Sequence, residues 1–295
     1  MNKLEIWTLV AVVLAGTGFT VVERFVPYNR DQRVVRTGFW TDLVLYCVVQ
    51  SYVMGIIIGR LILWMDQHTG FSRLGLVSHW SVLAQVGFFL VTHDLYIYTF
   101  HRLQHRIPTL WRLHEAHHSV PQVDWLSGAR SHAVEILINQ TIEFGPIVFL
   151  GATPAVAAIK GTVSAIWGMF IHANLDVRLG PLQYVFNGPE MHRWHHADDP
   201  AVYNKNFATK LAIWDWLFGT AYFPRPSEKK AAVYGLPYIV YPEYFPLGYF
   251  VQLALAFRPS IETGIATSPD QKVSSARLLA SPLVSPEPEQ IVTNA

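Results

Sequence analysis

Long apolar stretches limit the folds open to this chain more than any other feature. Residues 4–22, 43–65 and 80–100 are close to the length of about 20 residues that a helix needs to cross a bilayer. Residues 134–150 and 154–172 form two shorter apolar stretches. The composition agrees, because 51% of the residues are hydrophobic and only 15% are charged, whereas soluble domains carry about 25% charged residues. The sequence therefore predicts an all-α integral membrane protein, a helical bundle with about four spans.

The two ends of the chain are expected to behave differently. Residues 1–3 run directly into apolar residues that lack a small-residue cleavage site, so we expect a retained membrane helix rather than a signal peptide. Residues 261–295 are rich in Ser, Pro and Glu and contain few large apolar residues, so we expect a disordered tail. Residues 1–260 are predicted to form a single membrane-embedded domain.

The distribution of Lys and Arg predicts the orientation of the bundle, because these residues concentrate in cytoplasmic loops. Residues 24–36, 101–132 and the segment after 172 are all rich in basic residues. We expect these three segments on the cytoplasmic side, with 134–172 as a hairpin that turns at 151–154. The second and third segments would form a cytoplasmic helical cap. The net charge of only +1 argues against a nucleic-acid partner.

Three histidine clusters lie in the two cap segments and hold eight of the 13 histidines. A spacing of three or four residues places these side chains on one face of a helix. Imidazole is a common metal ligand, and eight nitrogens exceed the about four ligands of one tetrahedral ion. The sequence therefore predicts a site for two metal ions. Its ligands would be His101 and His105, then His114, His117 and His118, then His192, His195 and His196.

Other polar residues near the clusters are candidates for the same site. His172 ends an apolar stretch at the predicted cytoplasmic face, where an ionisable residue is usually functional, and is expected to be a ninth ligand. His132, at the start of another stretch, is a candidate tenth. Asp94 lies seven residues before His101, and its carboxylate can accept a hydrogen bond from a ligand imidazole. Asp215, between two tryptophans, is expected to support the site rather than bind metal.

The donor set and its predicted location favour iron. Imidazoles without a bridging carboxylate suit Fe, Zn, Cu or Ni. A site at the mouth of an apolar bundle would face a substrate dissolved in lipid, and most C–H bonds of lipids are unactivated. Oxidation of such bonds needs O2 and a redox metal, which favours iron over zinc.

The pattern Asp94-x6-His101-x3-His105, His114-x2-His117-His118 and His192-x2-His195-His196 resembles the fatty acid hydroxylase/sterol desaturase superfamily of membrane di-iron enzymes. The resemblance covers about residues 85–225 and includes His172-Ala-Asn174 and the stretch from Asn204 to Thr220. It implies two Fe ions and O2-dependent hydroxylation or desaturation of a sterol, fatty acyl or ether lipid. Asp94, Asn174 and Asp215 would surround the ligands.

The resemblance also implies an external electron donor, such as a reductase, a ferredoxin or a cytochrome b5-like protein. It places the enzyme in a bacterial inner membrane or the endoplasmic reticulum, with its active site on the cytoplasmic side. Gly180-Pro-Leu182, Asn187-x-Pro189, Lys205-Asn206 and Tyr234-Gly-Leu236 are most similar to the alkylglycerol monooxygenase branch and its bacterial relatives. For that branch a reduced pterin is a further candidate donor. Phe207-Ala208 departs from the Tyr-Gly that is common in the family.

Two other classes of function remain open from the sequence. His114, Glu115 and His118 match the H-E-x-x-H pattern of zinc hydrolases, in which the glutamate is the general base. A metal transporter would also need histidines, but would carry polar residues through its spans. Cys47 is the only cysteine, which excludes internal disulfides and a cluster held by four thiolates. The remaining histidines at 68, 79 and 93 are expected to be unrelated to metal.

Overall fold

The computed structural model describes residues 3–223, 230, 231, 233–236 and 248–257. Within these residues every named element is helical, and the only β-type pairings are two isolated bridges. The predicted all-α class is therefore confirmed. The predicted disordered tail, residues 261–295, lies outside the described residues.

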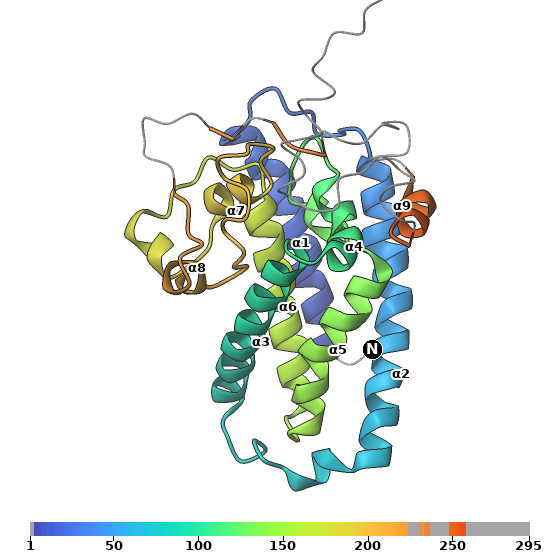
Figure 1. Ribbon diagram of the computed structural model, residues 1–295. Helices are drawn as coiled ribbons and strands as arrows, with labels where there is room; N and C mark the ends of the chain where they lie inside the picture. The colour runs from blue at the N-terminus through green and yellow to red at the C-terminus, as the bar shows by residue number, and fades with distance from the viewer. Residues whose placement is uncertain (1–2, 224–229, 232, 237–247, 258–295) are drawn as a thin grey trace, which may run out of the picture.

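The long helices form an elongated bundle (Figure 1). A π-helical segment, η1, runs directly into α2, so that residues 41–69 form one continuous rod. The bundle consists of α1 (Lys3–Phe25), η1 (Thr41–Gln50), α2 (Ser51–Thr69), α3 (Val82–Gln104), α5 (Ala133–Phe149) and α6 (Pro154–His172).

Three of these rods are long and apolar enough to cross a membrane: Lys3–Phe25, Thr41–Thr69 and Pro154–His172. The predicted stretches 80–100 and 134–150 are helical, but α3 and α5 do not join this set. α5 has only 17 residues and contains two glutamates, and α3 carries Asp94 and several other polar residues. The structure therefore supports fewer clear spans than the about four predicted, and some of the polar residues of α3 and α5, such as Gln104 and Glu135, line the cavity described below.

The outer faces of α1 and of the 41–69 rod expose large apolar side chains. Trp7, Leu14, Tyr52 and Trp64 are all more than half exposed. Contiguous apolar surface of this kind is unusual on a soluble protein and is typical of a face that contacts lipid. The protein is thus built as a membrane protein.

The predicted hairpin is present, since α5 ends at Phe149 and α6 begins at Pro154. Gly151 in its turn has a φ of +75°, and a Cβ atom there would lie 2.8 Å from the backbone of both Ser72 and Gly75. Only glycine fits this turn, which therefore packs tightly against the connection between α2 and α3.

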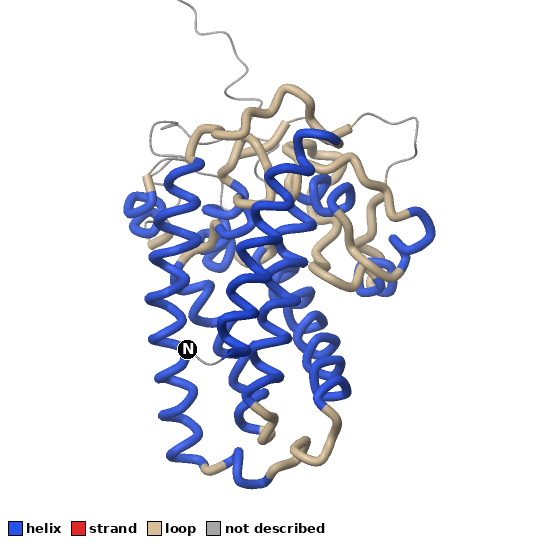
Figure 2. Tube along the Cα trace, turned by 180° about the vertical axis from the view of Figure 1, so that it is seen from behind, coloured by secondary structure: helices blue, strands red, loops and turns tan. Residues whose placement is uncertain are grey.

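Short helices and loops gather at the opposite end of the bundle from that connection (Figures 1 and 2). They form a cap at the end where α3 and α6 finish. The helices of the cap are α4 (Pro108–His118), α7 (Pro189–His195), α8 (Ile213–Leu217) and α9 (Tyr249–Leu255), and its 3-10 turns are η3 (Ser127–Ala129) and η4 (Gly180–Tyr184).

Candidate metal centre

Nine imidazoles converge where the bundle meets the cap. They form two groups, and in each group the potential ligand nitrogens all lie within 4.8 Å of one another. All nine side chains are buried. The five-histidine group comprises His101, His105, His114, His118 and His195, and the four-histidine group comprises His117, His172, His192 and His196.

Helix geometry distributes the ligands between the two groups. Neighbouring side chains on a helix point about 100° apart, so His117 and His118 at the end of α4 enter different groups. The same holds for His195 and His196 at the end of α7. Each of these two helices therefore serves both groups, and His172 completes the smaller group from the end of α6.

Hydrogen bonds from Nδ1 hold five of the rings. His114 donates to a carboxylate oxygen of Glu135 at 2.9 Å. Because a carbonyl oxygen can only accept, Nδ1 of each of the other four rings carries the proton and Nε2 keeps its lone pair. This tautomer leaves Nε2 available to a metal ion. The four carbonyl pairs, at 2.7 to 2.9 Å, are His101–Phe207, His117–Arg130, His172–Gly168 and His195–Lys205.

In the four-histidine group, two Nε2 atoms lie close together although neither carries a proton that it could donate to the other. His117 Nε2 lies 3.2 Å from His172 Nε2, although both rings carry their proton on Nδ1. Burial, with a smaller contribution from His114, lowers the pKa of His117 to about 4. A second proton therefore does not bridge the pair at neutral pH, and a cation between the lone pairs would relieve their repulsion. The donor set thus fits a metal ion.

The buried nitrogens of the five-histidine group fit a metal as well. Nε2 of His101 is buried and has no hydrogen-bond partner in the described part of the chain. His195 Nε2 lies 3.2 Å from His118 Nε2, and the Nδ1 proton of His195 is already held by the carbonyl of Lys205. Burial and the neighbouring imidazoles hold the pKa of His118 and His195 well below the usual range, so both rings are neutral ligands at pH 7.

Glu135 is a functional residue that the sequence reasoning did not identify. It lies in the first turn of α5, and the oxygen that binds His114 also accepts from Gln104 Nε2 at 2.8 Å. A carboxylate bonded to a ligand imidazole fixes its tautomer and raises its basicity. The sequence did contain an indication of this role: Glu135 is a charged residue at the start of an apolar stretch, and such residues are usually functional.

Asp94 does not have the role expected of it. Its carboxylate accepts hydrogen bonds from Thr209 Oγ1, Trp214 Nε1 and the amides of Lys210 and Leu211, at 2.8 to 3.1 Å, and from none of the histidines. The acceptor for the nearby imidazole is instead a main-chain carbonyl. Asp94 therefore fixes the loop of residues 209–214 to α3.

Asp215 contacts the centre indirectly, through the backbone of Phe207. Its carboxylate accepts from the amides of Phe207 and Ala208 at 2.8 and 2.9 Å and from Thr220 Oγ1 at 2.7 Å. The carbonyl of Phe207 in turn holds His101. Asp215 thus acts through the loop that carries this carbonyl.

Asn174 lies two residues after His172, but its side chain points to another part of the chain. Its Oδ1 accepts from the amide of Asn29 at 2.9 Å, and its Nδ2 donates to the carbonyl of Asn29 at 3.0 Å. Asn174 therefore anchors the segment after α1 rather than a ligand imidazole, which corrects the expectation.

The structure does not bring His132, the candidate tenth ligand, to either group. Its Nδ1 accepts from the amide of Val134 at 3.1 Å, so it caps the N-terminus of α5. Its Nε2 lies 3.1 Å from the carbonyl of Leu253 and donates to it. Both nitrogens of a neutral ring are satisfied by these bonds. His68, His79 and His93 also lie outside the two groups, as expected.

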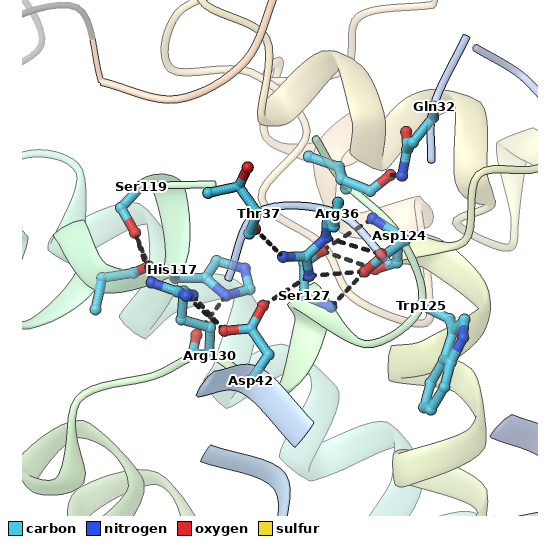
Figure 3. A network of polar contacts seen from close by, with 12 residues as sticks. Gln32, Arg36, Thr37, Asp42, His117, Ser119, Asp124, Trp125, Ser127 and Arg130 are labelled. Atoms are coloured by element: carbon cyan, nitrogen blue, oxygen red, sulfur yellow. Dashed lines mark hydrogen bonds and ion pairs between the residues drawn. The ribbon is translucent and has the colours of Figure 1, made fainter. Parts of the chain in front are cut away.

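A buried ionic network holds the four-histidine group to the N-terminal part of the chain (Figure 3). The carbonyl of Arg130 accepts from His117, and its guanidinium donates to Asp42 Oδ1 at 2.8 Å. Asp42 also accepts from Arg36 at 2.6 Å, and Arg36 donates to both carboxylate oxygens of Asp124. Two arginines and two aspartates thus balance their charges in the interior and fix one ligand.

A cavity of about 230 Å³ leads from the histidines into the bundle between α3, α4, α5 and α6. Nearest the histidine groups, its lining includes His101, His114, His117, His172 and His192, together with Phe100 and Ile171. Its other lining residues include His93, Asn139, Glu143, Ser164 and Lys210. A lipid group in this cavity would contact ligand residues from both groups.

The zinc-hydrolase pattern finds little support in this geometry. The Glu115 carboxylate is buried and forms an ion pair with Arg112 of the same helix. His114 and His118 share their group with three further histidines, so all five nitrogens compete for one ion. A hydrolytic zinc site normally has three protein ligands and an open position for water.

Comparison with known proteins finds similarity in the part of the chain that builds this centre. Residues 86–220 match the family model described as fatty acid hydroxylase. The chain is 38% identical over 159 residues to an ornithine lipid hydroxylase of Rhizobium tropici, covering 54% of this chain and 48% of that protein. It is 36% identical over 143 residues to an alkylglycerol monooxygenase of Danio rerio, covering 48% of this chain and 31% of that protein.

A sphingolipid C4-hydroxylase of Schizosaccharomyces pombe is 34% identical over 146 residues, which cover 48% of each chain. The chain thus spans about half the length, or less, of these relatives. No solved structure matches it. The matched relatives are named as hydroxylases or monooxygenases of lipids.

Proposed function

From the premise that residues 86–220 form a domain of the fatty acid hydroxylase family, we propose that the protein is an O2-dependent di-iron monooxygenase that hydroxylates a C–H bond of a membrane lipid. The reaction would take place on the cytoplasmic side of the membrane. An external donor, either a redox protein or a reduced pterin, would supply the electrons.

The observation that carries this proposal is the arrangement of nine buried imidazoles in two groups beside a cavity in an apolar bundle. The five-histidine group would hold one iron and the four-histidine group the other. Iron bound there supplies the redox chemistry that activates O2 and removes hydrogen from an unactivated C–H bond. The donor set is compatible with iron because neutral imidazole suits metals of intermediate softness.

The chain's own residues would position the lipid and keep the site dry. The cavity brings a bound group against His101 and His117, which belong to different groups. Phe100 and Ile171 provide apolar contacts beside them. Because the ligands are buried, bulk water is kept from the reacting carbon, which limits side reactions.

The test is lipid mass spectrometry of membranes from cells that express the chain, with and without O2. We expect an O2-dependent product heavier by one oxygen atom, and its loss when His118 is replaced by alanine. His68→Ala provides the matched control variant, because His68 is exposed, belongs to neither histidine group and bonds the carbonyl of Trp64 in its own helix. Product formed by the His118→Ala variant, or a hydrolysed lipid in place of an oxidised one, would contradict the proposal. Loss of two hydrogens instead of gain of oxygen would identify a desaturase.

A further inference from the structure

A set of polar residues lies in the cavity on the side away from the histidine groups. We call His93, Asn139, Glu143, Ser164 and Lys210 the polar wall; all five line the cavity. They come from α3, α5, α6 and the loop before α8. An apolar bundle that admitted only hydrocarbon chains would have no need for these side chains.

The polar wall lies deep in the bundle. His93 precedes His101 by eight residues in α3, and Glu143 follows Glu135 by eight residues in α5. At a rise of 1.5 Å per residue, both positions are about 12 Å along the helix axis from the residues at the metal centre. Two helices thus place polar groups at the same depth.

A buried lysine organises this wall. Lys160 lies within α6, one of the helices able to cross a membrane, and is fully buried. Its ammonium group donates to His93 Nδ1 at 2.9 Å and forms an ion pair with Glu143. Ionisable residues inside such helices are rare and usually functional.

Two buried polar atoms of the wall lack a partner. Because the ammonium of Lys160 can only donate, His93 accepts at Nδ1 and carries its own proton on Nε2. That Nε2 is buried and has no hydrogen-bond partner in the described part of the chain, and the same is true of Ser164 Oγ. His93 itself is only 9% exposed. Buried donors are normally satisfied, so a ligand in the cavity is the natural acceptor.

The charges at this end of the cavity already cancel. Lys160 is paired with Glu143, and Lys210 Nζ lies 3.6 Å from Asp94. An additional charged group would lack a counter-ion, and burial of an unpaired charge is costly. The available hydrogen-bond donors therefore suit a ligand group that is polar but carries no net charge.

We propose that the polar wall binds the uncharged, hydrogen-bonding end of the lipid substrate, a hydroxyl or amide group. The C–H bond to be oxidised would lie between that end and the histidines, which fixes its distance from the polar group. This inference rests on the proposed function for the identity of the ligand as a substrate, but the binding itself does not require turnover.

The test measures binding to the full-length, iron-loaded chain in detergent micelles without O2, so that no reaction occurs. The probes are a long-chain primary alcohol, the alkane of equal length and the alkyl phosphate of equal length. We expect the alcohol to bind most tightly of the three. We expect Ser164→Ala and His93→Leu each to weaken binding of the alcohol about fivefold to tenfold, the loss of one hydrogen bond, without affecting the alkane.

Thr162→Ala is the matched control, because the hydroxyl of Thr162 bonds the carbonyl of Ala158 in its own helix and does not line the cavity. Ser164 Oγ has no partner in the described protein, so its removal breaks no internal bond and folding is retained even if His93→Leu misfolds. Unchanged binding of the alcohol to Ser164→Ala, or equal or tighter binding of the alkane or the phosphate, would overturn the inference. Binding as expected without oxidation once O2 is admitted would instead refute the proposed function alone.

Discussion

Replacing Glu135 with alanine is expected to weaken metal binding at the five-histidine group and to spare the four-histidine group. Glu135 accepts the Nδ1 proton of His114, which belongs only to the five-histidine group. Two rings of the other group, His117 and His172, are held by main-chain carbonyls that this substitution leaves in place. The effect should therefore be confined to one of the two metal ions.

The size of the effect follows from the kind of bond that is lost. A hydrogen bond to a charged acceptor contributes about 1.5–3 kcal/mol, which corresponds to about tenfold to a hundredfold in affinity. Loss of residues that orient metal ligands usually lowers metal affinity by about the same factor. Glu135→Gln keeps an oxygen that can accept but removes the charge, so its effect should be nearer about tenfold.

The assay is the metal content of the purified chain after dialysis against increasing concentrations of a chelator. Glu135→Ala should lose one of its two ions at a much lower chelator concentration than the wild type does, and the other ion at the same concentration. Glu115→Gln is the matched control, because this buried glutamate forms an ion pair with Arg112. The reasoning is refuted if Glu135→Ala keeps both ions as firmly as the wild type. It is also refuted if Glu115→Gln, the control variant, is the one that loses metal.

Three further substitutions test the remaining assignments. His132→Ala should keep both metal ions, while loss of the α5 cap lowers the free energy of unfolding by about 1 kcal/mol; a drop in metal content would restore His132 as a ligand. Arg130→Met leaves Asp42 without one of its two buried partners and should destabilise the fold by about 3–5 kcal/mol. Thermal unfolding in detergent measures this loss. An unchanged unfolding temperature would show that the ionic network does not stabilise the fold. Asp94→Ala should release the loop of residues 209–214, so a protease should cleave that loop faster than in the wild type while the metal content stays the same. Loss of metal without faster cleavage would instead indicate that Asp94 bonds to a ligand imidazole.

The histidines could be predicted from the sequence because helical spacing alone determines which of them share a face. His114, His117 and His118 lie within one short helix, so their directions follow from 100° per residue. His132 and His172 look alike in the sequence, since each lies at one end of an apolar stretch. They differ because His132 begins its helix and caps it, whereas His172 ends its helix beside His117.

The supports of the ligands were harder to predict. Four of the nine ligand rings are held by main-chain carbonyls, and a carbonyl is present at every residue, so the residue type of Phe207 or Lys205 gives no signal. Asp94 was assigned to an imidazole from helix spacing, but a loop more than 100 residues later supplies its actual partners. Such long-range contacts depend on tertiary packing.

The same contrast holds for the fold: the positions of the helices follow from the local sequence, whereas their packing depends on residues far apart in the chain. The apolar stretches correctly located the long helices, and Gly151 marked the turn of the hairpin. α3 and α5 are not among the helices that are long and apolar enough to cross a membrane. The glutamates in α5 are explained only by their partners on other helices, Gln104 and Lys160.

The most direct test of two metal ions held by nine imidazoles is to count the ions in the purified full-length chain by elemental analysis. The geometry predicts two irons per chain, and about one when His192, one of only four histidines in its group, is replaced by alanine. A wild-type chain that holds a single zinc, or no metal after supply with iron under anaerobic conditions, would contradict the di-iron assignment.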